Sequence, residues 1–197
     1  VAENGRVIVD IPCITDWSSS KNSVHLPTTI TQDSFEVDIR SQPIRVIGLI
    51  PGQLFTEELH LNSTDDGILK MAVIERHHNT GNIGLGYVKG FQFKGGAIAS
   101  TVGHDAHNIA VVGDNDADMF LATKTLQLSG GGQCVISNEK VLAVLPLPIA
   151  GLMSDAPPEV VIAQQMELLQ AVSSLGCPLD DPFMPLSFLP LSVIPKL

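Results

Sequence analysis

Short runs of apolar residues in the first third of the chain predict β-strands. The runs are rich in β-branched residues and partly alternate with polar ones, a pattern typical of strands that bury one face. A polar stretch at 18–31, which contains Pro27, predicts a loop between the first run and the others. The predicted strands are residues 6–11 (RVIVDI), 35–39 (FEVDI) and 44–50 (IRVIGLI).

Apolar runs in the rest of the chain are nearly continuous, which predicts central strands buried on both faces. Turn-forming residues at 62–67 (NSTDDG) precede these runs and indicate a loop, which is also a candidate boundary between two subdomains. The predicted strands are 68–75, 96–102, 108–113, 134–136 and 141–145, with a hairpin turn at 137–140 between the last two.

Two segments, 117–128 and 157–175, carry the end signals of α-helices. The run 114–116 (DND) offers an N-cap and first-turn acids to the first helix, and Gly130 ends it. Prolines in the first turn and Gly176 after the last turn delimit the second helix. The expected core positions are Met119, Ala122, Thr123 and Leu126 in the first helix and Val161, Met166, Leu168, Leu169 and Val172 in the second, whose expected N-cap is Ser154 or Asp155.

The order of these elements predicts an α+β fold with layered mixed or antiparallel sheets and two main helices. Hairpins interleave with the helices, in contrast to the strict βαβ alternation of a parallel sheet. The segment 182–197 contains repeated prolines, which disfavour a regular helix or a central strand. Its Phe and Leu residues need a covering surface, so we expect an irregular tail that packs on the rest of the protein.

Composition and charge exclude several classes of protein. The hydrophobic share of 44% is too high for a disordered segment, and a net charge of −10 disfavours binding to a nucleic-acid backbone. The longest apolar run, 141–153, is interrupted by prolines, so we expect no membrane span. Cys13, Cys134 and Cys177 lie far apart, which predicts neither a disulfide framework nor a thiolate zinc site and favours the reducing cytoplasm.

A dense polar cluster follows the predicted strand 68–75. Residues 75–84 (ERHHNTGNIG) place a carboxylate, a guanidinium, two imidazoles and two amides on one turn. Gly-rich loops at strand ends often bind ligands, because the strand fixes the start of the loop and glycine lets the backbone approach closely. The alternative is a solvated turn. The candidate catalytic residues are His77 and His78, and the candidate binding residues are Arg76, Asn79 and Asn82.

A second polar cluster, 103–108 (GHDAHN), lies between the predicted strands 96–102 and 108–113. It will face the first cluster if the strands are neighbours. Neutral imidazole can act as an acid or base near pH 7 and can also bind a metal. The candidate catalytic residues are His104, Asp105 and His107, and Asn108 is a candidate binding residue; the alternative is that the histidines only bond to the loop backbone.

Several familiar catalytic signatures are absent. The chain contains no zinc base-deaminase signature, HExxH helix, P-loop or Gly-x-Ser-x-Gly elbow. The run 79–86 (NTGNIGLG) has glycines in the order GxxGxG, and the residues after it do not have a helical pattern. A dinucleotide-binding fingerprint is therefore disfavoured.

Four long segments form an ordered set of motifs: 74–90 (IERHHNTGNIGLGYVKG), 95–112 (GGAIASTVGHDAHNIAVV), 145–155 (LPLPIAGLMSD) and 181–195 (DPFMPLSFLPLSVIP). These motifs closely resemble the C-terminal portion of bacterial adenine deaminases of the amidohydrolase superfamily, and the likeness extends over nearly the whole chain. The resemblance implies a hydrolase of purine salvage that converts adenine and water into hypoxanthine and ammonia. It also implies a metal-dependent barrel upstream, which binds divalent manganese or iron.

The superfamily's His-x-His metal motif has no counterpart among the six histidines of this chain. We therefore expect residues 1–197 to be a C-terminal domain that lacks the barrel, holds no metal and is inactive alone. Its histidine-bearing turns would help to cover the barrel. The expected partners are that barrel, adenine and further copies in a homo-oligomer. Two alternatives stay open: a purely structural or oligomerisation domain, and an independent metal or small-ligand binder built from His77, His78, His104 and Asp105.

Overall fold

The computed structural model describes residues 2–9, 16–39, 42–63 and 65–195. Its elements in chain order are β1 (Ala2–Glu3), β2 (Arg6–Val7), the 3₁₀ turns η1 (Ser18–Ser20) and η2 (Gln32–Phe35), β3 (Ile44–Leu49), β4 (Thr56–Leu61), β5 (Ile68–Ile74), β6 (Ile83–Lys89), β7 (Ala97–Ser100), β8 (Ile109–Gly113), α1 (Asp116–Ser129), β9 (Gly132–Ser137), β10 (Lys140–Pro146), α2 (Pro158–Ser174) and α3 (Phe183–Phe188).

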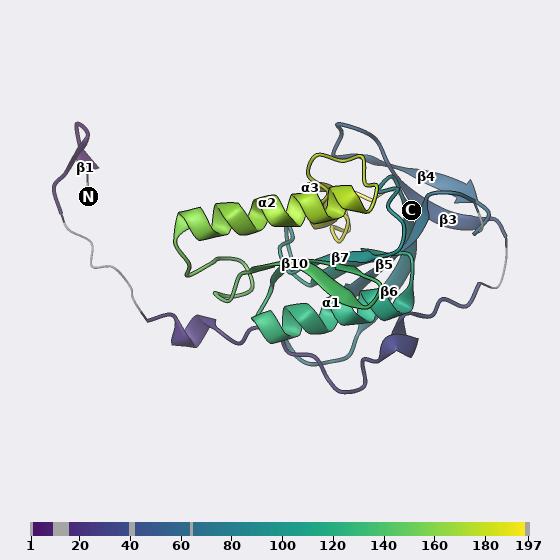
Figure 1. Ribbon diagram of the computed structural model, residues 1–197, viewed down its shortest axis with the longest axis horizontal. Helices are drawn as coiled ribbons and strands as arrows, with labels where there is room; N and C mark the ends of the chain where they lie inside the picture. The colour runs from purple at the N-terminus through teal and green to yellow at the C-terminus, as the bar shows by residue number, and fades with distance from the viewer. Residues whose placement is uncertain (1, 10–15, 40–41, 64, 196–197) are drawn as a thin grey trace.

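Eight strands form one mixed sheet in the order β10-β9-β7-β8-β5-β6-β3-β4, and β1 and β2 form a separate two-stranded ribbon (Figure 1). The neighbours in the large sheet pair antiparallel, except that β3 runs parallel to β6. The predicted α+β fold with mixed sheets is confirmed.

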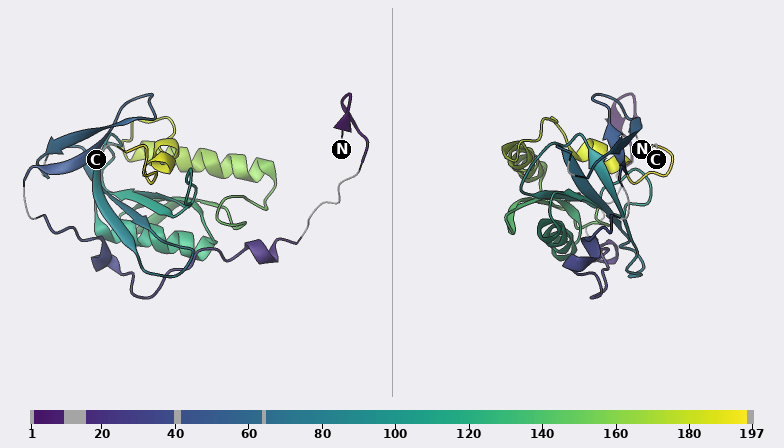
Figure 2. Two further views of the ribbon diagram at one scale, coloured as in Figure 1. Left: turned by 180° about the vertical axis from the view of Figure 1, so that it is seen from behind. Right: turned by 90° about the vertical axis from the view of Figure 1, so that its right-hand side faces the viewer.

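Helices cover both faces of the sheet, and each face has its own hydrophobic core. On one face α1 and Phe35 of η2 pack on β5, β7, β8 and β9, and their buried side chains include Met119 and Leu126. On the other face α2 and α3 pack with buried Leu168 and Leu186. The end-on view in Figure 2 shows α1 and α2 on opposite sides of the sheet.

The strand directions bring several turns together at one end of the sheet. Because β5, β7 and β10 run parallel to one another and antiparallel to β8 and β9, the ends of the first three meet the starts of the other two. The turns at this end are residues 75–82, 103–108 and 147–153, and we call it the histidine end. The opposite end carries the start of β5, the end of β8 and the N-terminus of α1.

The central strands and both main helices are confirmed. The five strands predicted from residue 68 onward correspond to β5, β7, β8, β9 and β10, and every residue of β7 and β8 is buried. Asn115 caps α1 by accepting a hydrogen bond from the Asp118 amide (2.8 Å), and Gly130 ends the helix with φ 75°. The predicted hairpin turn contains Asn138 and Glu139, both with positive φ.

The first third of the chain departs from prediction. The strand predicted at 6–11 comprises only β2 within the described residues, and residues 10–15, with Cys13, lie outside them. The strand predicted at 35–39 is wrong. Ser34 turns the chain into η2 by accepting a hydrogen bond from the Thr31 amide (3.1 Å), and Phe35 is fully buried against α1 instead of alternating in a sheet. The strand predicted at 44–50 is β3.

Two strands, β4 and β6, were not expected. β4 has the sequence TEELHL, in which adjacent polar residues obscure the alternation. β6 contains Gly84 and Gly86, and it pairs with β5 along its whole length. The second half of the glycine-rich run 79–86 is therefore sheet, not a ligand-binding loop. β4 and β5 belong to the same sheet on either side of residues 62–67.

The C-terminal tail contains the short helix α3, which corrects the prediction of a wholly irregular segment. Pro182 and Pro185 stand at its N-cap and in its first turn, where a missing N–H removes no intrahelical bond. The expected packing of the tail is confirmed, because Phe183, Leu186 and Leu189 are buried in the core beneath it.

Two details of α2 also differ from prediction. Its N-cap is Pro157, not Ser154 or Asp155. Met166, expected in the core, is 67% exposed, whereas Leu168 and Val172 are buried. None of the helices in the described residues is both long enough and apolar enough to cross a membrane.

Candidate functional site

The structure brings the two predicted polar clusters together at the histidine end. β5 and β8 are neighbours, with Ile74 opposite Ile109, so the turn after β5 lies beside the loop before β8. The His77 ring spans the two, since its Nε2 donates a hydrogen bond to the carbonyl oxygen of Ala106 (2.7 Å). The His25 ring in turn donates from Nδ1 to the His77 carbonyl (3.2 Å).

Glu75 organises the first turn through its carboxylate. One oxygen accepts hydrogen bonds from the amides of His77 (2.5 Å) and His78 (2.8 Å), and the other accepts from the amide and hydroxyl of Thr80 (3.1 and 2.8 Å). Burial alone would raise the pKa of Glu75, but these donors stabilise the ionised form and lower the pKa to about 2. The acid of this cluster is thus committed to holding the turn.

Arg76 is the largest fully buried polar side chain of the histidine end, at 1% exposure. Its Nε donates to the His107 carbonyl (2.5 Å), Nη2 to the Ala150 carbonyl (3.0 Å), and Nη1 to the carbonyl (2.8 Å) and hydroxyl (3.1 Å) of Ser23. No carboxylate in the described part of the chain forms an ion pair with it, and burial lowers its pKa. Arg76 therefore joins three segments, and its donors are not offered to a ligand.

Residues 149–153 fit closely around this guanidinium. A Cβ atom on Gly151, which has φ 71°, would lie 2.9 Å from Nη1 of Arg76. The Gly151 carbonyl accepts a hydrogen bond from the Thr101 hydroxyl (2.6 Å). Three of the four motifs noted in the sequence thus meet around one arginine.

The loop 103–108 is held partly by its own side chains. His107 has φ 49°, and its Nδ1 accepts from the Gly103 amide (3.2 Å). Burial, followed by the nearby Arg76 and His77, lowers the pKa of His107, which favours its neutral form near pH 7. His104 stacks on Phe188 of α3 with ring centroids 3.6 Å apart.

The remaining candidates divide between exposed and enclosed positions. The side-chain oxygen of Asn108 is buried without a hydrogen-bond partner. The cavity lined by this loop and α3 has about 10 Å³ of internal space, room for about one water molecule, and no residue of the first turn lines it. The clusters are adjacent, but they do not share this cavity. The exposed candidates are His77, His78, Asn79, Asn82, His104 and Asp105.

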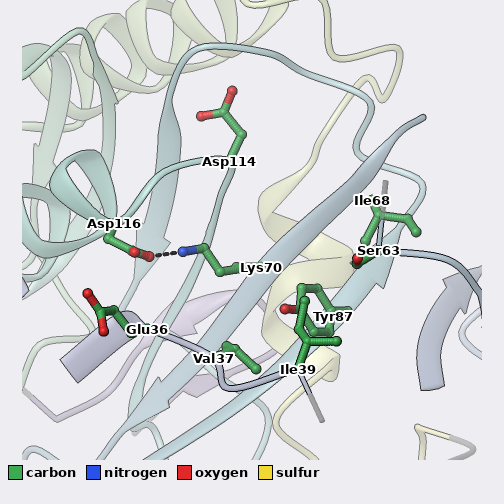
Figure 3. Close-up of a pocket in the computed structure, with 9 residues that line it drawn as sticks. All are labelled: Glu36, Val37, Ile39, Ser63, Ile68, Lys70, Tyr87, Asp114 and Asp116. Atoms are coloured by element: carbon green, nitrogen blue, oxygen red, sulfur yellow. Dashed lines mark hydrogen bonds and ion pairs between the residues drawn. The ribbon is translucent and has the colours of Figure 1, made fainter. Parts of the chain in front are cut away.

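A larger recess of about 450 Å³ lies at the opposite end of the sheet (Figure 3). Lys70 of β5 forms an ion pair with Asp116 at the start of α1, and Glu36 points toward the same pair. Burial lowers the pKa of Lys70, while Glu36 and Asp114 raise it. The Asp114 carboxylate accepts hydrogen bonds from the amides of Gly95 and Gly96, so it also fixes the turn before β7.

Sequence patterns did not identify this recess. Lys70 and Tyr87 sit on adjacent strands, in register with each other, and only the pairing of β5 with the unexpected strand β6 brings them together. The only available signal was a lysine inside an otherwise apolar strand, which indicates a nearby acid but not which one.

No three His, Cys, Asp or Glu side chains in the described residues lie close enough together to hold a metal ion. The set His77, His78, His104 and Asp105 therefore does not form a metal site in this structure.

Comparison with known proteins identifies the family of this fold and its motifs. Residues 53–197 match the family described as the adenine deaminase C-terminal domain. The match covers well over half of the chain, and the chain belongs to this family.

Curated relatives carry the name adenine deaminase. The chain is 42% identical over 211 residues to the protein from Moorella thermoacetica, 43% over 208 residues to that from Nitratidesulfovibrio vulgaris and 45% over 185 residues to that from Gluconobacter oxydans. These alignments cover 100%, 100% and 89% of this chain but only 35%, 36% and 33% of the relatives. The chain thus spans about a third of the length of these proteins.

Replacing Arg76 tests its structural role. Arg76→Met keeps the apolar part of the side chain but leaves the carbonyls of Ser23, His107 and Ala150 without their donors. Buried groups left unpaired cost roughly 1–3 kcal/mol each, so we expect the free energy of unfolding in urea to fall by about 3 kcal/mol or more. The control is Arg45→Met, at an exposed position of β3, which should change it by less than about 0.5 kcal/mol. Equal effects of the two substitutions would contradict the assignment.

The turn held by Glu75 should make stability depend on pH. Its folded pKa of about 2 lies below the ordinary value of 4.5, so its stabilising effect is complete above pH 4.5 and is lost as pH falls toward 2. The stability difference between the protein and its Glu75→Gln variant should therefore shrink across this window in urea titrations. Glu57→Gln, at an exposed position of β4, serves as control. If the difference in free energy of unfolding between the protein and Glu75→Gln stays the same from pH 6 to pH 2.5, the ionised Glu75 carboxylate does not stabilise the turn.

Proposed function

We propose that this chain is the C-terminal domain of an adenine deaminase, which converts adenine and water into hypoxanthine and ammonia in purine salvage. The observation that carries the proposal is the convergence of three family motifs on Arg76 at the histidine end, in a chain that aligns over its whole length with adenine deaminases. The cytoplasmic location stays a prediction from the separated cysteines, and a homo-oligomer stays a prediction from the resemblance.

The divalent metal implied by the family does not fit the described residues of this chain, because no cluster of three ligands exists among them. We therefore assign manganese or iron, together with the chemistry it supplies, to an upstream barrel. By this assignment the 197-residue chain alone releases no ammonia from adenine.

The histidine end would serve this reaction by covering the mouth of the barrel. Adenine presents ring-nitrogen acceptors and an amino donor, which suit the donors and acceptors of Asn79, Asn82 and the imidazoles. His78 is exposed, and its ring is tilted against that of His77 with centroids 6.3 Å apart. The Glu75 turn holds His77 and His78, and these two side chains can position adenine, relay a proton and exclude water.

A purely structural domain is the second candidate. It is favoured by Glu75 and Arg76, whose charged groups are hydrogen-bonded to other parts of this chain. The two candidates differ in where substitutions at exposed positions act. A structural domain loses stability or assembly, and a covering domain loses turnover while the assembly stays intact.

Turnover of the longer protein that contains this chain tests the proposal. With manganese added, the unaltered protein should release ammonia from adenine, and His78→Ala should lower kcat by about tenfold or more, the scale of lost acid–base or positioning help. His60→Ala removes an exposed histidine from β4 and should leave kcat unchanged. If kcat is unchanged in His78→Ala, the turn has only a structural role. If the unaltered protein has no deaminase activity, the proposed function is wrong.

A further inference from the structure

Helix α2 exposes apolar side chains in only one half. Ile162, Met166 and Gln170 follow one another at intervals of four residues and form one ridge on the solvent side. Ile162 is 59% exposed and Met166 67% exposed, and Val160 is exposed as well. The exposed residues of the C-terminal half are polar: Glu167, Gln170, Ser173 and Ser174.

The chain enters the body of the domain beside this apolar half. The Ser20 carbonyl accepts a hydrogen bond from the Ala150 amide (2.6 Å), and the Lys21 ammonium pairs with the Asp155 carboxylate (2.7 Å). Met153 lies in the same turn and is 55% exposed. Figure 1 shows η1 and the N-terminal end of α2 at the same end of the molecule's long axis.

A docked partner would explain this asymmetry. An exposed patch of large apolar side chains with polar surroundings typically marks an interaction surface. The polypeptide outside this chain accounts for about two-thirds of the length of the relatives, since the chain covers 35% of the Moorella thermoacetica protein and its family is a C-terminal domain. Under the proposed function, the preceding part of the protein is joined to the body of the domain through the segment that continues at residues 16–21.

We infer that Met153, Val160, Ile162 and Met166, the α2 patch, form the surface on which the preceding part of the same polypeptide docks. The inference rests on the proposed function, which supplies the longer chain. It adds a docking surface that would hold the preceding part of the polypeptide next to the histidine end. β10 ends at the histidine end and leads through residues 147–157 into α2, so a body held on the patch would face the histidine turns.

The competing occupant is a second copy of the protein. A second copy could bind a patch at any place on the surface, whether or not the chain enters the domain nearby. The polar C-terminal half of α2 would be as accessible to a copy as the apolar half. The restriction of exposed apolar residues to the half beside residues 16–21 therefore favours the same polypeptide.

Site-specific photo-crosslinking in the longer protein distinguishes these occupants. The photoreactive residue p-benzoylphenylalanine replaces Met166 in one variant, Ile162 in a second, and Gln170 in the control on the same ridge. After irradiation, we expect a product of monomer size on a denaturing gel at both patch positions. Mass spectrometry should link α2 to peptides that precede this chain, with a yield at least fivefold above that at Gln170.

Two results would overturn the inference: a dimer-sized product that dominates at the patch positions, or a yield at both patch positions no higher than at Gln170. Ammonia release from adenine, measured on the same samples, keeps the proposed function separate. An active protein without the expected crosslink refutes the docking surface alone, whereas an inactive unaltered protein refutes the function.

Discussion

The histidine end depends on the burial of one guanidinium. Arg76 leaves the sheet at the end of β5 and donates to carbonyls of three segments that lie far from it in the sequence. A buried cation without a carboxylate is costly unless each of its donors is bonded, so the backbone of all three segments must be placed around it at once. Gly151 satisfies this constraint by having no Cβ where the guanidinium lies.

This constraint separates the residues that build the site from those that face outward. Glu75 and Arg76 are adjacent in sequence, and both charged groups are hydrogen-bonded within the protein, Glu75 to amides of its own turn and Arg76 to carbonyls of other segments. The side chains they leave exposed are the imidazoles of His77 and His78. A rigid turn that exposes imidazoles is the arrangement expected of a domain that presents groups to a partner, since loosely held groups position a substrate poorly. The α2 patch supplies a place for that partner to dock.

Patterns in the sequence predicted most of the large sheet and both main helices but missed the strands β4 and β6. Strands β7 and β8 were identifiable because burial on both faces requires continuous apolar runs, and α1 because its cap and its glycine stop are local signals. β4 has many polar residues and lies at the sheet edge, while β6 contains glycines that resemble a loop. For η2 a local hydroxyl–amide bond overrode the strand propensity of the residues around Phe35.

The candidate site was predictable to the same limited extent. Strand ends and polar clusters predicted that the two clusters would meet if β5 and β8 were neighbours, and the structure supplies that pairing. The burial of Arg76 was not predictable, because two of its acceptors, Ser23 and Ala150, lie 53 and 74 residues away in the chain. A local pattern identifies an arginine on a turn as a candidate binding residue. Only the tertiary structure shows that its guanidinium already donates hydrogen bonds to backbone carbonyls.

The most direct test of the Arg76 account is amide hydrogen exchange, compared between the protein and its Arg76→Lys variant. Lysine retains the charge but cannot reach three carbonyls in different directions. The account predicts faster exchange in all three bonded segments, near Ser23, His107 and Ala150, with α1 and β9 unchanged. Faster exchange confined to the turn that carries residue 76, or no change in any of the three, would contradict it.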